Sequence, residues 1–167
     1  GVMSLLWGAP ALAEKMDLEA NDLVIGKLES TLKSLKQEDK TINIVTLKIQ
    51  LANLYSEKAR LLLVEEGKQS CDNCLKSVNT RQKAIELYSS VTPQQLDQDG
   101  GQSSLQLAYL LEATNSNKTL PIYNRLIQKK TTTKANLIKS YSKRAEFYFK
   151  DGAFDKSIAD FQKAQSL

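Results

Sequence analysis

The segment from Tyr141 to Ala164 constrains the fold most, because its pattern predicts two helices joined by one sharp turn. Ala145 and Tyr148 are three residues apart and therefore share a helix face. Asp151-Gly152 ends this helix, since glycine accepts the backbone conformation that closes a helix. Stripe positions at the i, i+4, i+7 spacing then predict a second helix. The segment combines small residues, which allow two helices to approach closely, with aromatic residues that fill the gaps: Ala145, Ser157 and Ala164 are small, and Tyr141, Tyr148 and Phe161 are aromatic.

The same stripe recurs earlier in the chain. Ala84, Tyr88 and Val91, followed by Pro93, have the spacing of Ser157, Phe161 and Ala164. Thr119-Leu120, Tyr123 and Leu126 form a similar stripe without the small residues. The aromatic anchors Tyr88, Tyr123 and Phe161 are 35 and 38 residues apart. Ahead of these stripes, Ala52 and Tyr55 match the small-then-aromatic pair of a first helix, and Ala108 and Leu111 match it less well. The pattern therefore predicts three helical hairpins, in residues 45–93, 101–130 and 138–167.

On these residues the chain resembles a tetratricopeptide repeat (TPR) protein, a family whose repeat is 34 residues long. The resemblance implies an all-α fold, a TPR-like right-handed α-solenoid of about seven helices, whose concave groove binds partner proteins. The proline that normally ends the motif would fall beyond Leu167, so we expect the last hairpin to be truncated. Two phrases, Leu51–Arg60 and Arg81–Tyr88, are also similar to those of exported bacterial cell-envelope TPR proteins of the type associated with gliding motility.

The expected helices cover residues 17–36, 41–66, 78–90, 103–113, 119–129, 134–150 and 154–166. We divide the chain into an apolar segment at 1–13, an N-terminal helix within 14–40, and three hairpins in 41–167. The N-terminal helix would cap the solenoid. The first hairpin carries an irregular insert at 67–77 that holds both cysteines, and residues 94–101 are expected to be a polar loop.

Residues 1–13 contain no charged side chain and end in Ala11-Leu12-Ala13, an A-x-A pattern of the kind that signal peptidase cuts. One interpretation is the tail of a signal peptide, which places the protein in the periplasm or cell envelope. The alternatives are an apolar arm that packs on the domain or on a neighbour, and a scar of cloning. A cytoplasmic location remains the alternative to export.

The composition argues against an enzyme. The chain has no histidine, which excludes Ser-His-Asp and Cys-His nucleophiles and His-ligated metal sites. It has no glycine-rich phosphate loop. Acidic residues such as Glu65-Glu66, Asp97 and Asp99 are interpreted as solvated helix ends and loops. We therefore expect no catalytic residue, metal, cofactor or small-molecule substrate. The net charge of +4 is spread along the helices, which favours a solvated surface over nucleic-acid binding.

Cys71-Asp-Asn-Cys74 is the one specific chemical motif. A structural disulfide is compatible with export and would pin the insert. Two unpaired thiols, or a redox or metal site, are the other interpretations. A zinc site needs four ligands, which two thiolates could supply only if a second chain shared the metal.

The resemblance also suggests groove residues. Some TPR proteins hold the terminal carboxylate of a peptide with Lys, Asn and Arg side chains on their first helices. The matching positions here, with one apolar anchor further along the same helix, are Asn53, Gln106, Lys139, Lys143 and Phe149. Ile49 replaces the lysine expected in the first hairpin, and ordinary solvated lysines are the alternative interpretation.

These observations predict a scaffold or adaptor of the periplasm or cell envelope, which binds an acidic and apolar segment of a partner protein in an envelope complex. Two alternatives stay open. One is a cytosolic co-chaperone that binds peptide carboxylates, and the other is a thiol redox or metal-binding protein that acts through Cys71 and Cys74.

Overall fold

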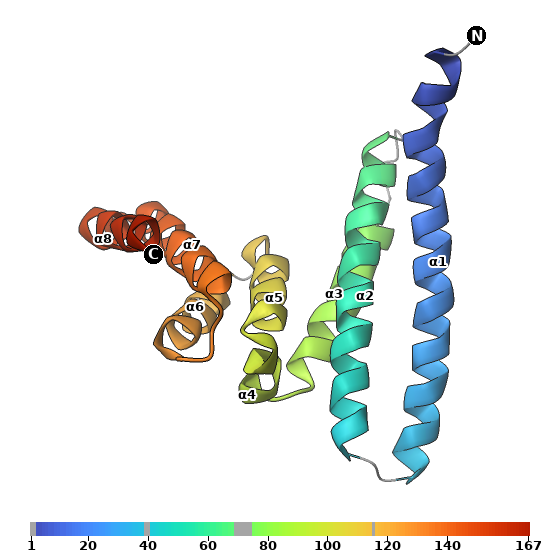
Figure 1. Cartoon of the computed structure of the whole chain (residues 1–167), viewed down its shortest axis with the longest axis horizontal. Coiled ribbons are helices and arrows are strands. Elements are labelled where there is room, and N and C mark those ends of the chain that lie inside the picture. The colour runs from blue at the N-terminus through green and yellow to red at the C-terminus, as the bar shows by residue number, and fades with distance from the viewer. Residues whose placement is uncertain (1–2, 39–40, 69–74, 115) are drawn as a thin grey trace. The chain divides into compact units, whose positions relative to one another are not determined.

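The computed structural model describes the backbone of residues 3–38, 41–68, 75–114 and 116–167, and all of its regular structure there is helical. The all-α prediction is confirmed (Figure 1). The helices, in chain order, are α1 (Met3–Glu38), α2 (Thr41–Lys68), α3 (Lys76–Ser89), α4 (Pro93–Leu96), α5 (Gln102–Glu112), α6 (Thr119–Gln128), α7 (Lys134–Lys150) and α8 (Phe154–Ser166), with single 3-10 turns at Asp97–Asp99 and Ser116–Lys118. They form two compact units, residues 1–90 and 91–167, and each is described by itself.

Every helix expected from periodicity is present, but the structure adds two features. Helix α1 begins at Met3, so most of the segment expected to precede the first helix is itself helical. The loop expected at 94–101 contains α4 and a 3-10 turn. Thr92 and Gln95 form a reciprocal capping box around Pro93, which is the first residue of α4.

In the N-terminal unit, α2 packs against both α1 and α3. The buried side chains include Ile25 and Leu32 on α1, Leu51, Ala52, Tyr55, Ala59 and Leu62 on α2, and Ala84 and Tyr88 on α3. Leu23 and Val24 of α1, which have helical spacing in the sequence, are instead 76% and 45% exposed. Glu66, which we expected to be a solvated acid at a helix end, has a structural role as well. It accepts hydrogen bonds from the backbone nitrogen and the hydroxyl of Ser77 and thereby joins the end of α2 to the first turn of α3.

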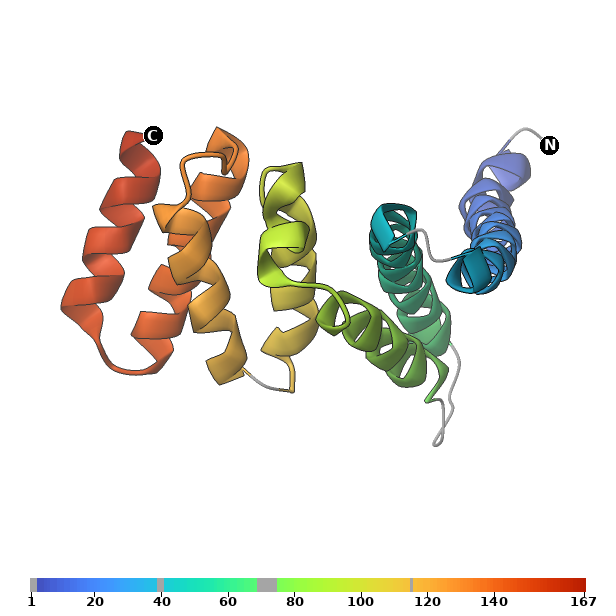
Figure 2. The ribbon, with the colours of Figure 1, turned by 90° about the horizontal axis from the view of Figure 1, so that it is seen from below.

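In the C-terminal unit, each of α5, α6 and α7 packs against the helix that follows it, and α5 also contacts α7 (Figure 2). Two glycines in the left-handed conformation precede α5, Gly100 with φ 74° and Gly101 with φ 93°. The carbonyl of Gly100 accepts hydrogen bonds from the backbone nitrogen of Thr133, at 3.1 Å, and from the side chain of Asn136, at 3.0 Å. The start of α5 is therefore tied to the start of α7.

Helices α7 and α8 pack as the hairpin pattern predicts. Ala145 is 0% exposed and Ser157 is 2% exposed, and the Ser157 hydroxyl donates a hydrogen bond of 2.8 Å to the Ala145 carbonyl. Gly152, with φ 78°, ends α7. The expectation that Phe161 fills the gap between the two helices is wrong, because Phe161 is 42% exposed and lies on another side of α8.

A candidate protein-binding face on α7

The positive charge of the chain lies on the C-terminal unit. Residues 91–167 contain 11 Lys and Arg and seven Asp and Glu, a net charge of +4, which equals the net charge of the whole chain. The N-terminal unit is therefore formally neutral. An excess of one charge on one unit favours partners of the opposite charge.

Three lysines of α7 share one helix face. Lys139, Lys143 and Lys150 follow an i, i+4, i+11 pattern, which places their side chains within about 40° around the helix axis. Lys139 and Lys150 are exposed and make no ion pair within the described part of the chain. We call the surface formed by these three lysines and Glu146 the α7 basic face.

Lys143, unlike its two neighbours, already has acidic partners. Its Nζ lies 3.3 Å from Glu112 of α5 and 3.1 Å from Glu146, and it stands 5.2 Å from the centre of the Tyr109 ring. Burial alone would lower the pKa of Lys143, but the hydrogen bond to Glu146 and the charge of Glu112 hold the pKa above its usual value. Lys143 therefore holds α5 and α7 together, and Lys139 and Lys150 are the lysines that remain for a partner.

A cavity of about 200 Å³ opens beside the α7 basic face, between residues of α5, α6 and α7. Tyr123 lines this cavity and is 1% exposed. Its hydroxyl donates a hydrogen bond of 3.1 Å to Glu112. Burial, followed by the charge of Glu112, raises the pKa of the Tyr123 hydroxyl. The lining residues are Glu112, Asn117, Thr119, Tyr123, Lys143, Glu146, Phe147, Lys150 and Asp151. The cavity is therefore lined by side chains of both charges and by the rings of Tyr123 and Phe147.

Phe149 supplies an exposed aromatic side chain on the same helix. Its side chain is 61% exposed and packs edge-on against Phe154 of α8, with ring centres 5.5 Å apart and planes at 67°. Lys139, Lys143 and Phe149 are therefore all on α7. Gln106 is half-buried on α5 of the same unit. Asn53 belongs to the N-terminal unit, where its side chain accepts a hydrogen bond from the Tyr88 hydroxyl. Cys71 and Cys74 lie outside the described residues.

Sequence reasoning missed the residue that fixes this hairpin, Arg144. Its guanidinium donates two hydrogen bonds to Asp160 of α8, at 2.7 and 2.8 Å, and one of 2.8 Å to Asn124 of α6. Arg144 thereby joins three successive helices. A signal was present, because residues 144 and 160 lie opposite each other once Ala145 and Ser157 are paired.

The N-terminal unit has a second cavity, of about 350 Å³, lined by residues of all three of its helices. Tyr55 donates a hydrogen bond to Glu29 at this cavity, and burial together with that carboxylate raises the pKa of Tyr55 to about 12. The Nζ of Lys83 stands 5.5 Å from the Tyr55 ring centre. The lining residues are Glu29, Leu32, Lys48, Tyr55, Lys83, Glu86, Leu87 and Ser90, two acids and two lysines among them, so the cavity favours neither charge.

Comparison of the chain with models of protein families, with curated proteins and with solved structures finds no match. Within the described ranges, none of the helices has the length and apolarity needed to cross a membrane. The same residues contain no cluster of three or more acidic or thiol side chains that could hold a metal ion.

Proposed function

We propose that the protein is an adaptor whose C-terminal unit binds an acidic, partly apolar segment of a partner protein along the α7 basic face. The observation that carries this proposal is the placement of the net charge: all of it lies on this unit, and Lys139 and Lys150 on one face of α7 have no acidic partner among the described residues.

The geometry beside these lysines supports an acidic segment with an apolar anchor. Lys139 and Lys143 are four residues apart and repel each other weakly, and a carboxylate of the partner near Lys139 would relieve this repulsion. Tyr123 and Phe147, whose rings line the neighbouring cavity, supply apolar surface next to the charges. Such a face uses charge for steering and apolar contact for affinity.

We further propose that the helical hairpins are TPR-like repeats of a solenoid and that the adaptor acts in the bacterial periplasm or cell envelope. The paired stripes around Ala84, Thr119 and Ser157 support the first part, and the close contact of Ala145 with Ser157 fits a repeat hairpin. The Ala11-Leu12-Ala13 pattern supports export.

The test is a titration of the full chain with two fluorescent peptides, one rich in Glu with a single Leu anchor and one with every Glu replaced by Lys. We expect the acidic peptide to bind the wild type and to bind the Lys139→Glu/Lys150→Glu variant at least tenfold more weakly. Binding should also weaken as salt screens the charges. Lys143 is left unchanged, because reversing it would break its contacts with Glu112 and Glu146.

The matched control is Lys163→Glu, which reverses an exposed lysine of α8 away from the α7 basic face. It should leave the affinity within twofold of the wild-type value. Equal binding of the acidic peptide by the wild type and the double variant would contradict the proposal, as would a preference for the basic peptide.

A further inference from the structure

Helix α8 carries an uncovered apolar stripe. Phe154, Ile158 and Phe161 follow the i, i+4, i+7 spacing and are 56%, 55% and 42% exposed. Phe149 of α7, in edge-on contact with Phe154, extends the stripe at one end. The opposite flank of α8, with Ser157 and Asp160, is buried against α7. We call Phe149, Phe154, Ile158 and Phe161 the α8 apolar face.

The chain itself shows what covers such a stripe. A constant offset of 38 residues aligns Thr119, Leu120 and Tyr123 of α6 with Ser157, Ile158 and Phe161 of α8. On α6 the stripe is covered: α7 packs directly against α6, and Tyr123 is 1% exposed at a cavity that it shares with Phe147 of α7. On α8 the equivalent aromatic position is 42% exposed. The side of α6 that contacts α7 therefore corresponds to a side of α8 that is exposed.

The size of the face fits one helix of a partner. Four large apolar side chains that are each about half exposed present roughly 400 Å² in total, given about 200 Å² for a side chain of this size. This is the size of a functional patch on a monomer. A single amphipathic helix of about three turns matches it.

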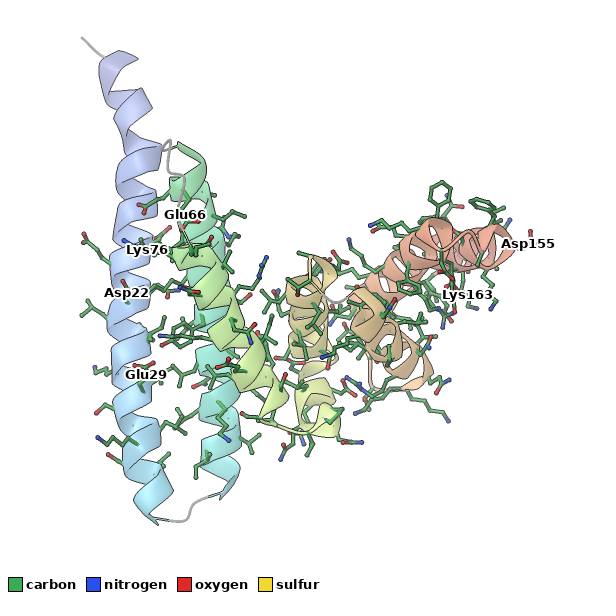
Figure 3. All side chains as sticks on the ribbon, turned by 180° about the vertical axis from the view of Figure 1, so that it is seen from behind. Asp22, Glu29, Glu66, Lys76, Asp155 and Lys163 are labelled. Carbon is green, nitrogen blue, oxygen red and sulfur yellow. The ribbon has the colours of Figure 1, made fainter. Side chains whose placement is uncertain are left out.

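The charge beside the stripe defines the partner further. Asp155 is exposed and lies about 100° around α8 from Phe154, on the flank turned away from α7 (Figure 3). Lys163, the exposed lysine near the other end of α8, points about 180° away from Phe154. A helix lying on the stripe would therefore meet a carboxylate, and a basic side chain at that place complements it.

We infer that the α8 apolar face binds one amphipathic α-helix of a partner protein, with apolar side chains at i, i+4 and i+7 and a basic side chain that reaches Asp155. This surface is separate from the α7 basic face, and the two prefer partner segments of opposite charge. One hairpin could hold two different segments.

The probe is a synthetic peptide with the sequence of residues 134–150, held helical by an i, i+4 staple on its solvent side. This sequence is chosen because α7 covers the equivalent stripe of α6, and it is basic. We expect the labelled peptide to bind the full chain and to bind the Ile158→Glu variant at least tenfold more weakly. The control Lys163→Glu places the same acid on the opposite side of α8, about 180° from Phe154, and should change the affinity less than twofold.

Two further readouts make the test decisive. Circular dichroism of both variants checks that α8 still folds. The Lys139→Glu variant, which alters the α7 basic face ten residues away from Phe149, should bind the stapled peptide within about twofold of the wild type, which separates the two surfaces. Absence of peptide binding to the wild type would overturn the inference. So would self-association of the full chain in sedimentation that Ile158→Glu abolishes, because the occupant would then be a second copy.

Discussion

At the scale of single residues, Asp97 is the side chain whose role differs most from the expectation. Its carboxylate is 1% exposed instead of solvated. Arg125 donates hydrogen bonds of 2.8 and 3.2 Å to the two carboxylate oxygens, Ser104 donates one of 2.5 Å, and Lys129 lies 3.5 Å away. A buried carboxylate with this many donors is satisfied, and it ties the start of the unit to the end of α6.

Removal of this carboxylate should destabilise the C-terminal unit. We expect Asp97→Ala to lower the free energy of unfolding by about 3 kcal/mol at pH 7, because Arg125 would lose its partner in a partly buried place. Chemical denaturation followed by circular dichroism measures the change. Asp155→Ala, which removes an exposed acid of the same unit, should stay within about 0.5 kcal/mol of the wild type.

The ion pair of Asp97 and Arg125 also predicts that stability depends on pH. Burial tends to raise the pKa of Asp97, but the hydrogen bonds from Arg125 and Ser104 outweigh burial and hold the pKa below its usual value. The stabilisation is therefore present above the unfolded-state pKa, about 3.9, and is lost as the pH falls through the lower pKa of the folded state. The stability gap between wild type and Asp97→Ala should narrow below about pH 4. A gap that stays constant down to pH 2 would contradict this assignment.

The sequence alone could not show that Asp97 is buried. Its partner Arg125 lies 28 residues further along the chain, and the pairing depends on how α5 and α6 pack. The polar composition of residues 94–101 pointed to an exposed loop for the same reason. Thr92, Pro93 and Gln95 did carry a local signal for a helix start, but Pro93 was interpreted only as an end signal.

At the scale of elements, the prediction was accurate because helical periodicity and glycine stops are local signals. Helices α7 and α8 have the expected bounds, and Thr133 caps α7 by accepting a hydrogen bond from the backbone nitrogen of Asn136. Which side of α8 would remain exposed was not predictable, since Phe154, Ile158 and Phe161 have the same pattern as a buried stripe. Among the candidate site residues, the sequence placed Lys139 and Lys143 on one helix face, but it gave no sign that Lys143 pairs with Glu112.

The hairpin contact gives a test of this element. We expect Ala145→Trp to cost roughly 1–3 kcal/mol, because Ala145 is 0% exposed and its carbonyl accepts the hydrogen bond from Ser157. Thermal unfolding measures the change. Ala159→Trp, at an exposed position of α8, is the matched control. An Ala145→Trp protein with unchanged stability would mean that the two helices are not in close contact.

At the scale of the whole molecule, the chain consists of two compact units, and its net charge lies on one of them. The division at residue 90 was not predicted. The repeat pattern runs through it, since the stripe of Ala84 and Tyr88 continues to Val91 and Pro93, whereas compactness depends on which helices touch. The helical stripes likewise do not indicate the cellular compartment of the protein. The redox state of the two cysteines does.

If the protein is exported, we expect a disulfide between Cys71 and Cys74 in protein purified from its own compartment. The closed loop is very short, so its contribution to the stability of the fold is modest. A double Cys→Ser variant should fold with nearly the wild-type melting temperature. Mass spectrometry under non-reducing conditions decides the pairing, and two free thiols would contradict the disulfide.

The glycine pair at 100–101 makes one connection of this protein as intolerant of change as a core position. A Cβ atom on Gly100 would lie 2.5 Å from the side chain of Thr133, and one on Gly101 would lie 2.8 Å from the side chain of Leu126. Loops are ordinarily where a chain accepts substitutions and inserted tags. An inserted tag should therefore be placed elsewhere than in this turn. At Gly152, by contrast, an added Cβ meets no atom within 4 Å, and asparagine should be tolerated there because it accepts the left-handed backbone.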